Sequence, residues 1–219
     1  MLSRRQLFHR IASSLLGAAV FSATPIAARA ADPQPAGGFL ASMTSRAIEQ
    51  LTDTSLELDE RQRRFQILFR ENFDIPAIGR FVIGRYWRGT SEKARTDFLE
   101  VFEEVMVRRF APQFAGYAGT RFRVGMIREI KENAQFIVAT TIKPPQGDSV
   151  RIDWRVQRRD GHFQILDVIG QGVSMALTLR SEYTAVIKNT GGRVEGLTLL
   201  LRERLRQQGD ITATTSAAK

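Results

Sequence analysis

The sequence predicts an α+β domain in which helices come first, an antiparallel four-stranded sheet follows, and further helices lie on the apolar face of that sheet. Apolar residues recur at helical spacing up to about residue 110 and again after residue 173. Between these regions, four segments alternate apolar and polar residues and are joined by short links rich in Gly, Pro, Asn and Asp. Links this short allow only antiparallel pairing of neighbouring strands.

The first 30 residues have the layout of a secretory signal. A basic start that includes Arg4 and Arg5 is followed by the apolar run 11–21 and by small residues that end at Ala30. The apolar run has 11 residues, whereas a membrane-spanning helix needs ~20. We therefore expect cleavage after Ala30 and export to the periplasm, either by the twin-arginine route that the Arg pair resembles or by the ordinary secretory route.

Cleavage would leave 189 of the 219 residues and lower the formal charge from +9 to +5, because residues 1–30 hold four arginines and no acid. This mildly basic balance suits an acidic membrane surface or an acidic protein partner. Export and the lack of basic runs interleaved with aromatic residues argue against nucleic acid. The chain has no cysteine, so disulfides and thiolate chemistry are excluded.

The helices are bounded by local signals. Residues 31–38 are rich in Pro and Gly and predict a flexible leader, after which a single domain over 39–209 opens with a helix over 39–51. Asp59 and Asp74 are suited to cap two further helices, the second of which reaches residue 87.

A longer helix is expected to begin at Ser91 and to end before Pro112. Arg108 and Arg109 lie in its last turn, where positive charge suits the helix dipole. Its apolar face consists of Ala94, Phe98, Phe102, Val105, Met106 and Phe110.

The four strands are expected over 122–130, 135–143, 150–158 and 162–169. The alternation is cleanest in the third strand, which predicts a sheet with one apolar and one polar face. In the fourth strand it slips at Val168. Two helices follow, over 173–188 and from 194 to Gly209, and residues 210–219 are expected to form a disordered tail.

Residues 172–176, GVSMA, fall one residue short of the nucleophile elbow G-x-S-x-G. Such hydrolases need an acid and then a histidine after the serine, but no histidine follows Ser174. The histidine left after cleavage, His162, begins the strand that ends before Gly172, and an extended chain of this length separates it from Ser174 by about 25 Å. We therefore interpret Ser174 as a helix cap and Gly172 as a sharp turn. One histidine and no cysteine argue against a zinc site.

Two further observations leave alternatives open. Asp153 alternates with Arg151 and Arg155, which favours a solvated ion pair over a catalytic acid. Many large apolar residues lie on faces that should converge, and they can form either a packed core or the wall of an apolar cavity.

Four short motifs carry a resemblance to a known family. They are Phe73-Asp74-Ile75-Pro76, Gly84-Arg85-Tyr86-Trp87, Asp167-Val168 with Gly172-Val173-Ser174, and Arg180-Ser181-Glu182-Tyr183. From about Phe65 to Leu205 the chain resembles the MlaC / toluene-tolerance auxiliary family of periplasmic lipid-transport proteins. The resemblance implies a curved sheet with helices on one face that enclose an apolar cavity.

The same resemblance implies a monomeric carrier without enzymatic activity, metal or cofactor, whose cargo is a phospholipid. Its partners would be an outer-membrane lipoprotein complex and an inner-membrane ABC transporter with an MCE domain.

The resemblance also implies which residues line the cavity. These are Phe81, Val82, Tyr86, Trp87, Phe98, Phe102, Val105, Met106, Phe110, Val124, Phe136, Val138, Ile152, Trp154, Ile165, Val168, Val173, Met175 and Leu177. We assign Arg80, Arg85 and Arg88, which recur along one helical segment, to partner docking, with an ordinary solvated face as the alternative.

Departures from the family pattern leave the lipid class open. Leu179 precedes the Arg-Ser pair where many members have tyrosine, and Tyr183 stands where phenylalanine is common. The alternatives are a hopanoid-related carrier, an isomerase-type enzyme with a cone-shaped, NTF2-like pocket, and a structural adaptor that uses the basic face.

Overall fold

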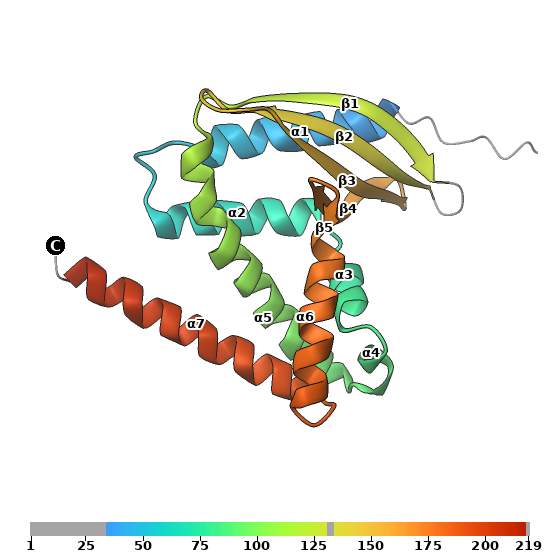
Figure 1. The fold of residues 1–219 in the computed structure, drawn as a ribbon, viewed down its shortest axis with the longest axis vertical. Coiled ribbons are helices and arrows are strands. Elements are labelled where there is room, and N and C mark those ends of the chain that lie inside the picture. Colours follow the sequence, from blue (N-terminus) through green and yellow to red (C-terminus); the bar gives the residue numbers. More distant parts are fainter. Residues whose placement is uncertain (1–33, 131–133, 218–219) are drawn as a thin grey trace, which may run out of the picture. The chain divides into compact units, whose positions relative to one another are not determined.

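The structure is a computed structural model that describes residues 34–130 and 134–217, with side chains described up to Gln208. The predicted signal over 1–30 and the first residues of the leader lie outside this part. The described residues belong to one compact unit of the chain (Figure 1). Within them, every helix is too short or too polar to cross a bilayer.

The helices before the sheet are α1 (Gln34–Leu51), α2 (Leu58–Asn72), α3 (Ile75–Ile83), α4 (Tyr86–Gly89) and α5 (Glu92–Phe110), followed by the 3-10 helix η1 (Ala111–Tyr117). The strands are β1 (Arg121–Ile130), β2 (Gln135–Lys143), β3 (Val150–Arg159), β4 (His162–Gly170) and β5 (Val173–Ser174). The chain continues with α6 (Met175–Asn189) and α7 (Val194–Ala217).

Helix α1 begins at Gln34, so the prediction of a flexible leader is wrong for residues 34–38. Ala36 and Leu40 are fully buried beneath the sheet. A Cβ atom on Gly37 would lie only 2.6 Å from the Ile127 side chain, so glycine permits the close approach of helix and strand. The composition of this segment favours a loop, but burial against β1 keeps the segment helical.

Of the two predicted helix caps, the one at Asp74 is confirmed, and the long helix begins after Ser91 as expected. The predicted cap at Asp59 is wrong, because α2 begins at Leu58 and Asp59 lies inside its first turn. The Asp74 carboxylate accepts a hydrogen bond from the backbone N–H of Ala77 at 3.0 Å, and the Ser91 hydroxyl accepts one from Ala94 at 3.2 Å. The expected helix to residue 87 is divided, because Gly84 adopts φ +56° and turns the chain between α3 and α4.

The sheet is antiparallel throughout, in the order β1-β2-β3-β4-β5, and therefore has five strands where we expected four. The additional strand, β5, pairs Val173 with Gly170 and Ser174 with Ile169. Two residues are too few for an alternation that a sequence could reveal.

A bulge explains the slip in the fourth strand. Arg155 pairs with Asp167 and Val156 pairs with Ile165, so Leu166 is an extra residue in β4. A bulge increases the local twist of a sheet, which agrees with the predicted curvature.

Helix α1 covers the apolar face of the sheet (Figure 1). Ala36, Leu40 and Met43, one helical stripe, pack against the buried strand residues Phe136 and Val138. The expectation that the last two helices cover this face is wrong: α6 packs mainly on α3 and β4, and α7 packs on α5 and α6.

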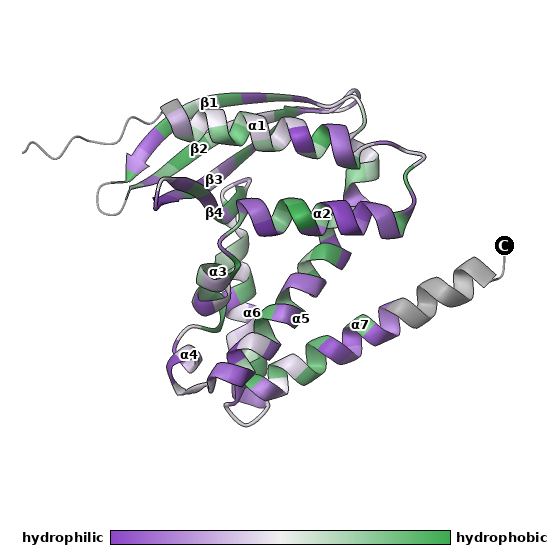
Figure 2. Ribbon diagram, turned by 180° about the vertical axis from the view of Figure 1, so that it is seen from behind, coloured by the Kyte–Doolittle hydropathy of each residue, from purple (hydrophilic) through white to green (hydrophobic). Residues whose placement is uncertain are grey.

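A second core lies among the helices, where Phe98, Phe102, Ile187 and Leu197 are buried. Figure 2 shows hydrophilic and hydrophobic residues mixed along α2 and α5, as expected of helices with one buried side. Helix α7 continues past Gly209 to Ala217, so the expected tail is helical over most of its length. A glycine inside a helix costs ~1 kcal/mol but does not end it.

Candidate lipid-binding site

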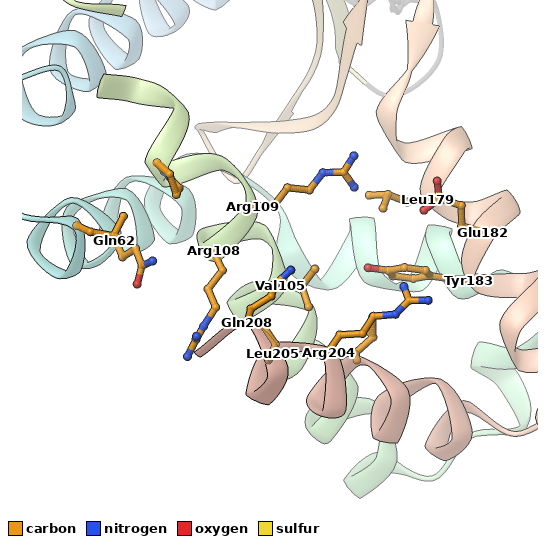
Figure 3. A pocket seen from close by; sticks show the side chains of 13 residues that line it. Gln62, Val105, Arg108, Arg109, Leu179, Glu182, Tyr183, Arg204, Leu205 and Gln208 are labelled. Carbon is orange, nitrogen blue, oxygen red and sulfur yellow. The ribbon is translucent and has the colours of Figure 1, made fainter. Parts of the chain in front are cut away.

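A cleft with a volume of about 600 Å³ lies between helices α2, α5, α6 and α7 (Figure 3). Ligand pockets are usually about 300–1,000 Å³, so this cleft is large enough for part of a lipid. It is lined by Leu58, Gln62, Val105, Arg108, Arg109, Pro112, Leu179, Glu182, Tyr183, Leu201, Arg204, Leu205 and Gln208.

The cleft combines apolar and basic surfaces. Leucines from α2, α6 and α7 join Val105 in an apolar lining, whereas the charged residues are three arginines and Glu182. Arg108 forms an ion pair with Glu104 at 2.9 Å on its own helix. Neither Arg109 nor Arg204 forms an ion pair with any residue whose side chain the structure describes.

Tyr183 forms part of the cleft wall. Its side chain is 5% exposed and meets the rings of Phe98 and Phe102 edge-on, with centroid distances of 6.2 and 6.3 Å. Burial raises the pKa of Tyr183 to about 12, the charge of Glu182 adds to this rise, and Arg109 and Arg204 oppose it. The phenol is therefore neutral at physiological pH and has both arginines near it.

A second pocket lies where the helices meet the end of the sheet. Its volume is only about 40 Å³, and its wall is almost entirely apolar. It is lined by Phe69, Phe73, Ile78, Phe102, Met106, Leu166, Asp167, Val168, Met175, Ala176 and Leu179. Leu179 also lines the cleft, so the two spaces are neighbours across this side chain.

Comparison with known proteins assigns the family. The family model described as "MlaC protein" matches residues 41–203, most of the chain. This chain belongs to the MlaC family.

Two known proteins are similar to this chain. An intermembrane phospholipid transport system binding protein MlaC of Haemophilus influenzae is 22% identical over 116 residues, which are 52% of this chain and 54% of the relative. The match thus spans about half the length of that curated relative. A phospholipid-binding protein of Ralstonia solanacearum, solved in complex with a phospholipid, is 18% identical with a TM-score of 0.72. The superposition covers 78% of this chain and 97% of the other, so the two share the fold.

The MlaC-family lining residues predicted from the sequence lie in five different places. Val105 lines the cleft, and Phe102, Met106, Val168 and Met175 line the apolar pocket. Val82 and Phe98 are buried in the helical core, with Tyr86, Trp87 and Phe110 packed against it. Phe136, Val138 and Ile165 are buried beneath α1, with Val124 and Trp154 beside them, and Ile152 is half-buried on β3. Phe81, Val173 and Leu177 are 37%, 63% and 59% exposed.

This distribution has a physical cause. Because α1 covers the sheet, the inward residues of the strands fill a core and line neither the cleft nor the apolar pocket. Val173 lies on β5, which is an edge strand of the sheet formed by the described residues. The sequence reasoning missed Leu58, Leu201 and Arg204, because helical periodicity identifies an apolar face but not the helices that meet it.

The family motif around Ser174 is a structural lock. The Ser174 hydroxyl donates to Asp167 Oδ2 at 2.5 Å and accepts from the backbone N–H of Leu177 at 3.0 Å. Asp167 Oδ1 accepts from the backbone N–H of Ala176 at 2.9 Å. The interpretation of Ser174 as a helix cap is confirmed, and the lock holds the start of α6 against the apolar pocket.

Asp153 lines neither the cleft nor the apolar pocket. It accepts a hydrogen bond from Arg151 Nε at 2.9 Å, which confirms the predicted ion pair. Among the described residues, no group of three or more His, Asp and Glu side chains is placed to hold a metal ion.

The three arginines assigned to docking share one hollow of about 530 Å³. Arg80, Arg85 and Arg88 line it together with Arg180 of α6, which the sequence reasoning missed although it begins the Arg-Ser-Glu-Tyr motif. The Arg180 guanidinium lies 4.9 Å from the centroid of the Phe81 ring and donates to the Phe81 carbonyl at 2.9 Å. The lining contains no acidic residue, so the hollow is strongly basic.

Proposed function

We propose that this chain is a periplasmic carrier that binds one phospholipid by its acyl chains and moves it between the outer membrane and an inner-membrane transporter. Membership of the MlaC family supports this role. So do the name of the Haemophilus influenzae relative and the bound phospholipid of the Ralstonia solanacearum protein.

The observation that carries the proposal is that the cleft and the apolar pocket meet at Leu179. On one side lies a cleft with apolar and basic walls, and on the other a small apolar pocket between helices and sheet. Each methylene group removed from water contributes about 0.8 kcal/mol, so a dry apolar space alone can hold a lipid. Shape and apolarity suffice for such a carrier, and catalysis is not required.

The acyl chains need more room than the small apolar pocket offers. Its volume of about 40 Å³ is far below that of an ordinary ligand site. Its walls include Met106 and Met175, whose unbranched side chains adapt readily to new neighbours. We expect the lipid-loaded form to displace these side chains together with Leu179, so that cleft and pocket become one cavity.

The same proposal assigns the partners. The hollow of Arg80, Arg85, Arg88 and Arg180 would dock on an acidic rim of the inner-membrane MCE-domain transporter complex. Its charge is suited to this because guanidinium groups bind carboxylates through paired donors. An outer-membrane lipoprotein complex would be the other partner, and export would follow from a signal cleaved after Ala30.

The test is direct. The full-length chain is produced with its own signal in a Gram-negative host, purified from the periplasm without detergent, and weighed by native mass spectrometry. We expect a species heavier than the mature chain by one phospholipid, which organic extraction removes and incubation with phospholipid vesicles restores. Protein that is lipid-free when isolated and takes up no lipid from vesicles would contradict the proposal.

A further inference from the structure

The basic wall of the cleft suggests how the head group is held. Arg109 comes from the last turn of α5 and Arg204 from the middle of α7. Figure 3 shows both side chains extending toward α6, where Glu182 and Tyr183 lie. Two cations from separate helices thus line the same cleft.

These two cations are available to a ligand. Arg109 lies 5.4 Å from the centroid of the Phe110 ring but has no carboxylate partner among the described side chains, and the same is true of Arg204. The third cleft arginine, Arg108, is already paired with Glu104. Glu182 is the one acid in the lining, so the cleft keeps a net positive charge.

The apolar lining lies beside this charge. Val105, Leu179 and Leu201 share the cleft with both arginines, and Leu179 also borders the small apolar pocket. A ligand that fits must therefore carry a negative group next to a long apolar body. Arginine is suited to a phosphodiester because its planar fork presents paired N–H donors.

We propose that Arg109 and Arg204 form a phosphate subsite at the mouth of the cavity, so that the carrier selects lipids by the head-group phosphate as well as by their chains. This inference rests on the proposed function. It assigns the cargo to phospholipids and disfavours lipids of similar apolar bulk without phosphate, such as diacylglycerol or a neutral polycyclic lipid. The acyl chains supply most of the affinity for any such lipid. The subsite therefore determines which of these lipids the carrier prefers.

The test compares lipids that differ only at the head group. Delipidated full-length mature protein is titrated with chain-labelled phosphatidylglycerol and with chain-labelled diacylglycerol of the same chains, in wild type and in Arg109→Gln/Arg204→Gln. We expect the double variant to bind phosphatidylglycerol about tenfold or more weakly, since two charge-assisted contacts are lost, and diacylglycerol unchanged. The double variant Lys93→Gln/Arg202→Gln is the matched control, because it removes two charges from the same two helices outside the cleft.

Several outcomes separate the possibilities. Equal binding of both lipids by wild type, with no change in the Arg109→Gln/Arg204→Gln variant, would overturn the phosphate subsite and leave the carrier proposal standing. Failure of wild type to bind either lipid would overturn both. If inorganic phosphate alone bound wild type as tightly as phosphatidylglycerol does, the arginines would form a site for the free anion. This result would also overturn the proposed subsite. Should the glutamine variant unfold, Arg109→Lys/Arg204→Lys keeps the charge and is expected to show a smaller loss for phosphatidylglycerol alone.

Discussion

Asp74 and Gln157, which are 83 residues apart in the sequence, meet in a buried hydrogen bond of 2.5 Å from the Gln157 amide to Asp74 Oδ2. The other Asp74 oxygen caps α3, and Arg159 of β3 lies 3.3 Å from the carboxylate. One carboxylate therefore fastens the helix that follows α2 to the third strand of the sheet. This explains the aspartate of the Phe-Asp-Ile-Pro motif without any role in chemistry.

Replacing Asp74 by alanine should destabilise the fold. The change removes a helix cap and leaves the buried Gln157 amide without its acceptor, which together should cost about 2–4 kcal/mol in the free energy of unfolding. Urea denaturation of wild type and variant measures this difference. Asp59→Ala, in the exposed first turn of α2, is the control and should cost less than 1 kcal/mol. A loss below 1 kcal/mol for Asp74→Ala would show that the contact does not fasten the two layers.

The buried Tyr183 predicts how stability depends on alkaline pH. Burial raises its pKa from 10.0 to about 12 in the folded chain, whereas in the unfolded chain the phenol ionises near its ordinary value. The stabilisation is fully present below pH 10 and is lost as pH rises through 12, with a total on the order of 2–3 kcal/mol. Tyr183→Phe should remove this part of the decline. Denaturant midpoints measured from pH 8 to pH 12 test this, and identical profiles for wild type and variant would contradict it.

The lock at the start of α6 predicts two separable effects. Ser174→Ala should cost ~1 kcal/mol through the lost cap and leave lipid content unchanged. Gly172→Val should cost more, because Gly172 has φ +81°, a conformation that disfavours branched side chains. Thermal unfolding together with extracted lipid per protein checks both. If folded Ser174→Ala protein lost a hydrolytic activity that wild type possesses, the reading of this turn as purely structural would fail.

Much of the local structure could be predicted from the sequence. The caps at Asp74 and Ser174 and the start of the long helix at Ser91 were identified because each is set by a few neighbouring residues. The bounds of β2 agree with expectation because its alternation is uninterrupted. The start of α1 was missed because burial under β1 outweighs its Pro/Gly composition.

The packing of elements distant in the sequence could not be predicted in the same way. Periodicity shows that a face is apolar, but it does not reveal that α1 covers the sheet or that α7 meets α5. Consequently Phe136 and Val138 were assigned to a cavity although they fill a core, and Arg204 was not considered at all. Charged and apolar side chains on one helix form a site only where a second helix packs opposite them.

The basic hollow predicts a transfer defect. Reversing the charge of Arg85 and Arg88 to glutamate should slow lipid transfer to the inner-membrane complex and leave the lipid content of the isolated protein unchanged, because neither residue lines the cleft. The defect should shrink as salt rises, since exposed charges are screened over ~8–10 Å at physiological ionic strength. A transfer assay between purified complexes at low and high salt measures this. Unimpaired transfer at low salt would identify the arginines as an ordinary solvated face.

Three tryptophan substitutions distinguish cavity from core. Val105→Trp lies in the cleft and should lower bound lipid with little loss of stability. Val138→Trp lies in the core under α1 and should overpack it, at a cost of about 1–3 kcal/mol. Val173→Trp lies on the exposed edge strand and should change neither quantity. Lipid content and denaturant unfolding, measured on all three, check this. A Val105→Trp variant that is destabilised like Val138→Trp would mean that the cleft wall is tightly packed.

The central claim, that acyl chains occupy the space between cleft and sheet, is tested most directly by locating a chain end. A phospholipid with a photoreactive diazirine at the end of one acyl chain is loaded into the purified protein and illuminated, and the modified peptides are identified by mass spectrometry. The account predicts labelling of α5 and α6 at the residues that line the apolar pocket, chiefly Phe102, Met106 and Leu179. Labelling confined to exposed positions such as Leu177 or Leu199, with these residues unmodified, would contradict it.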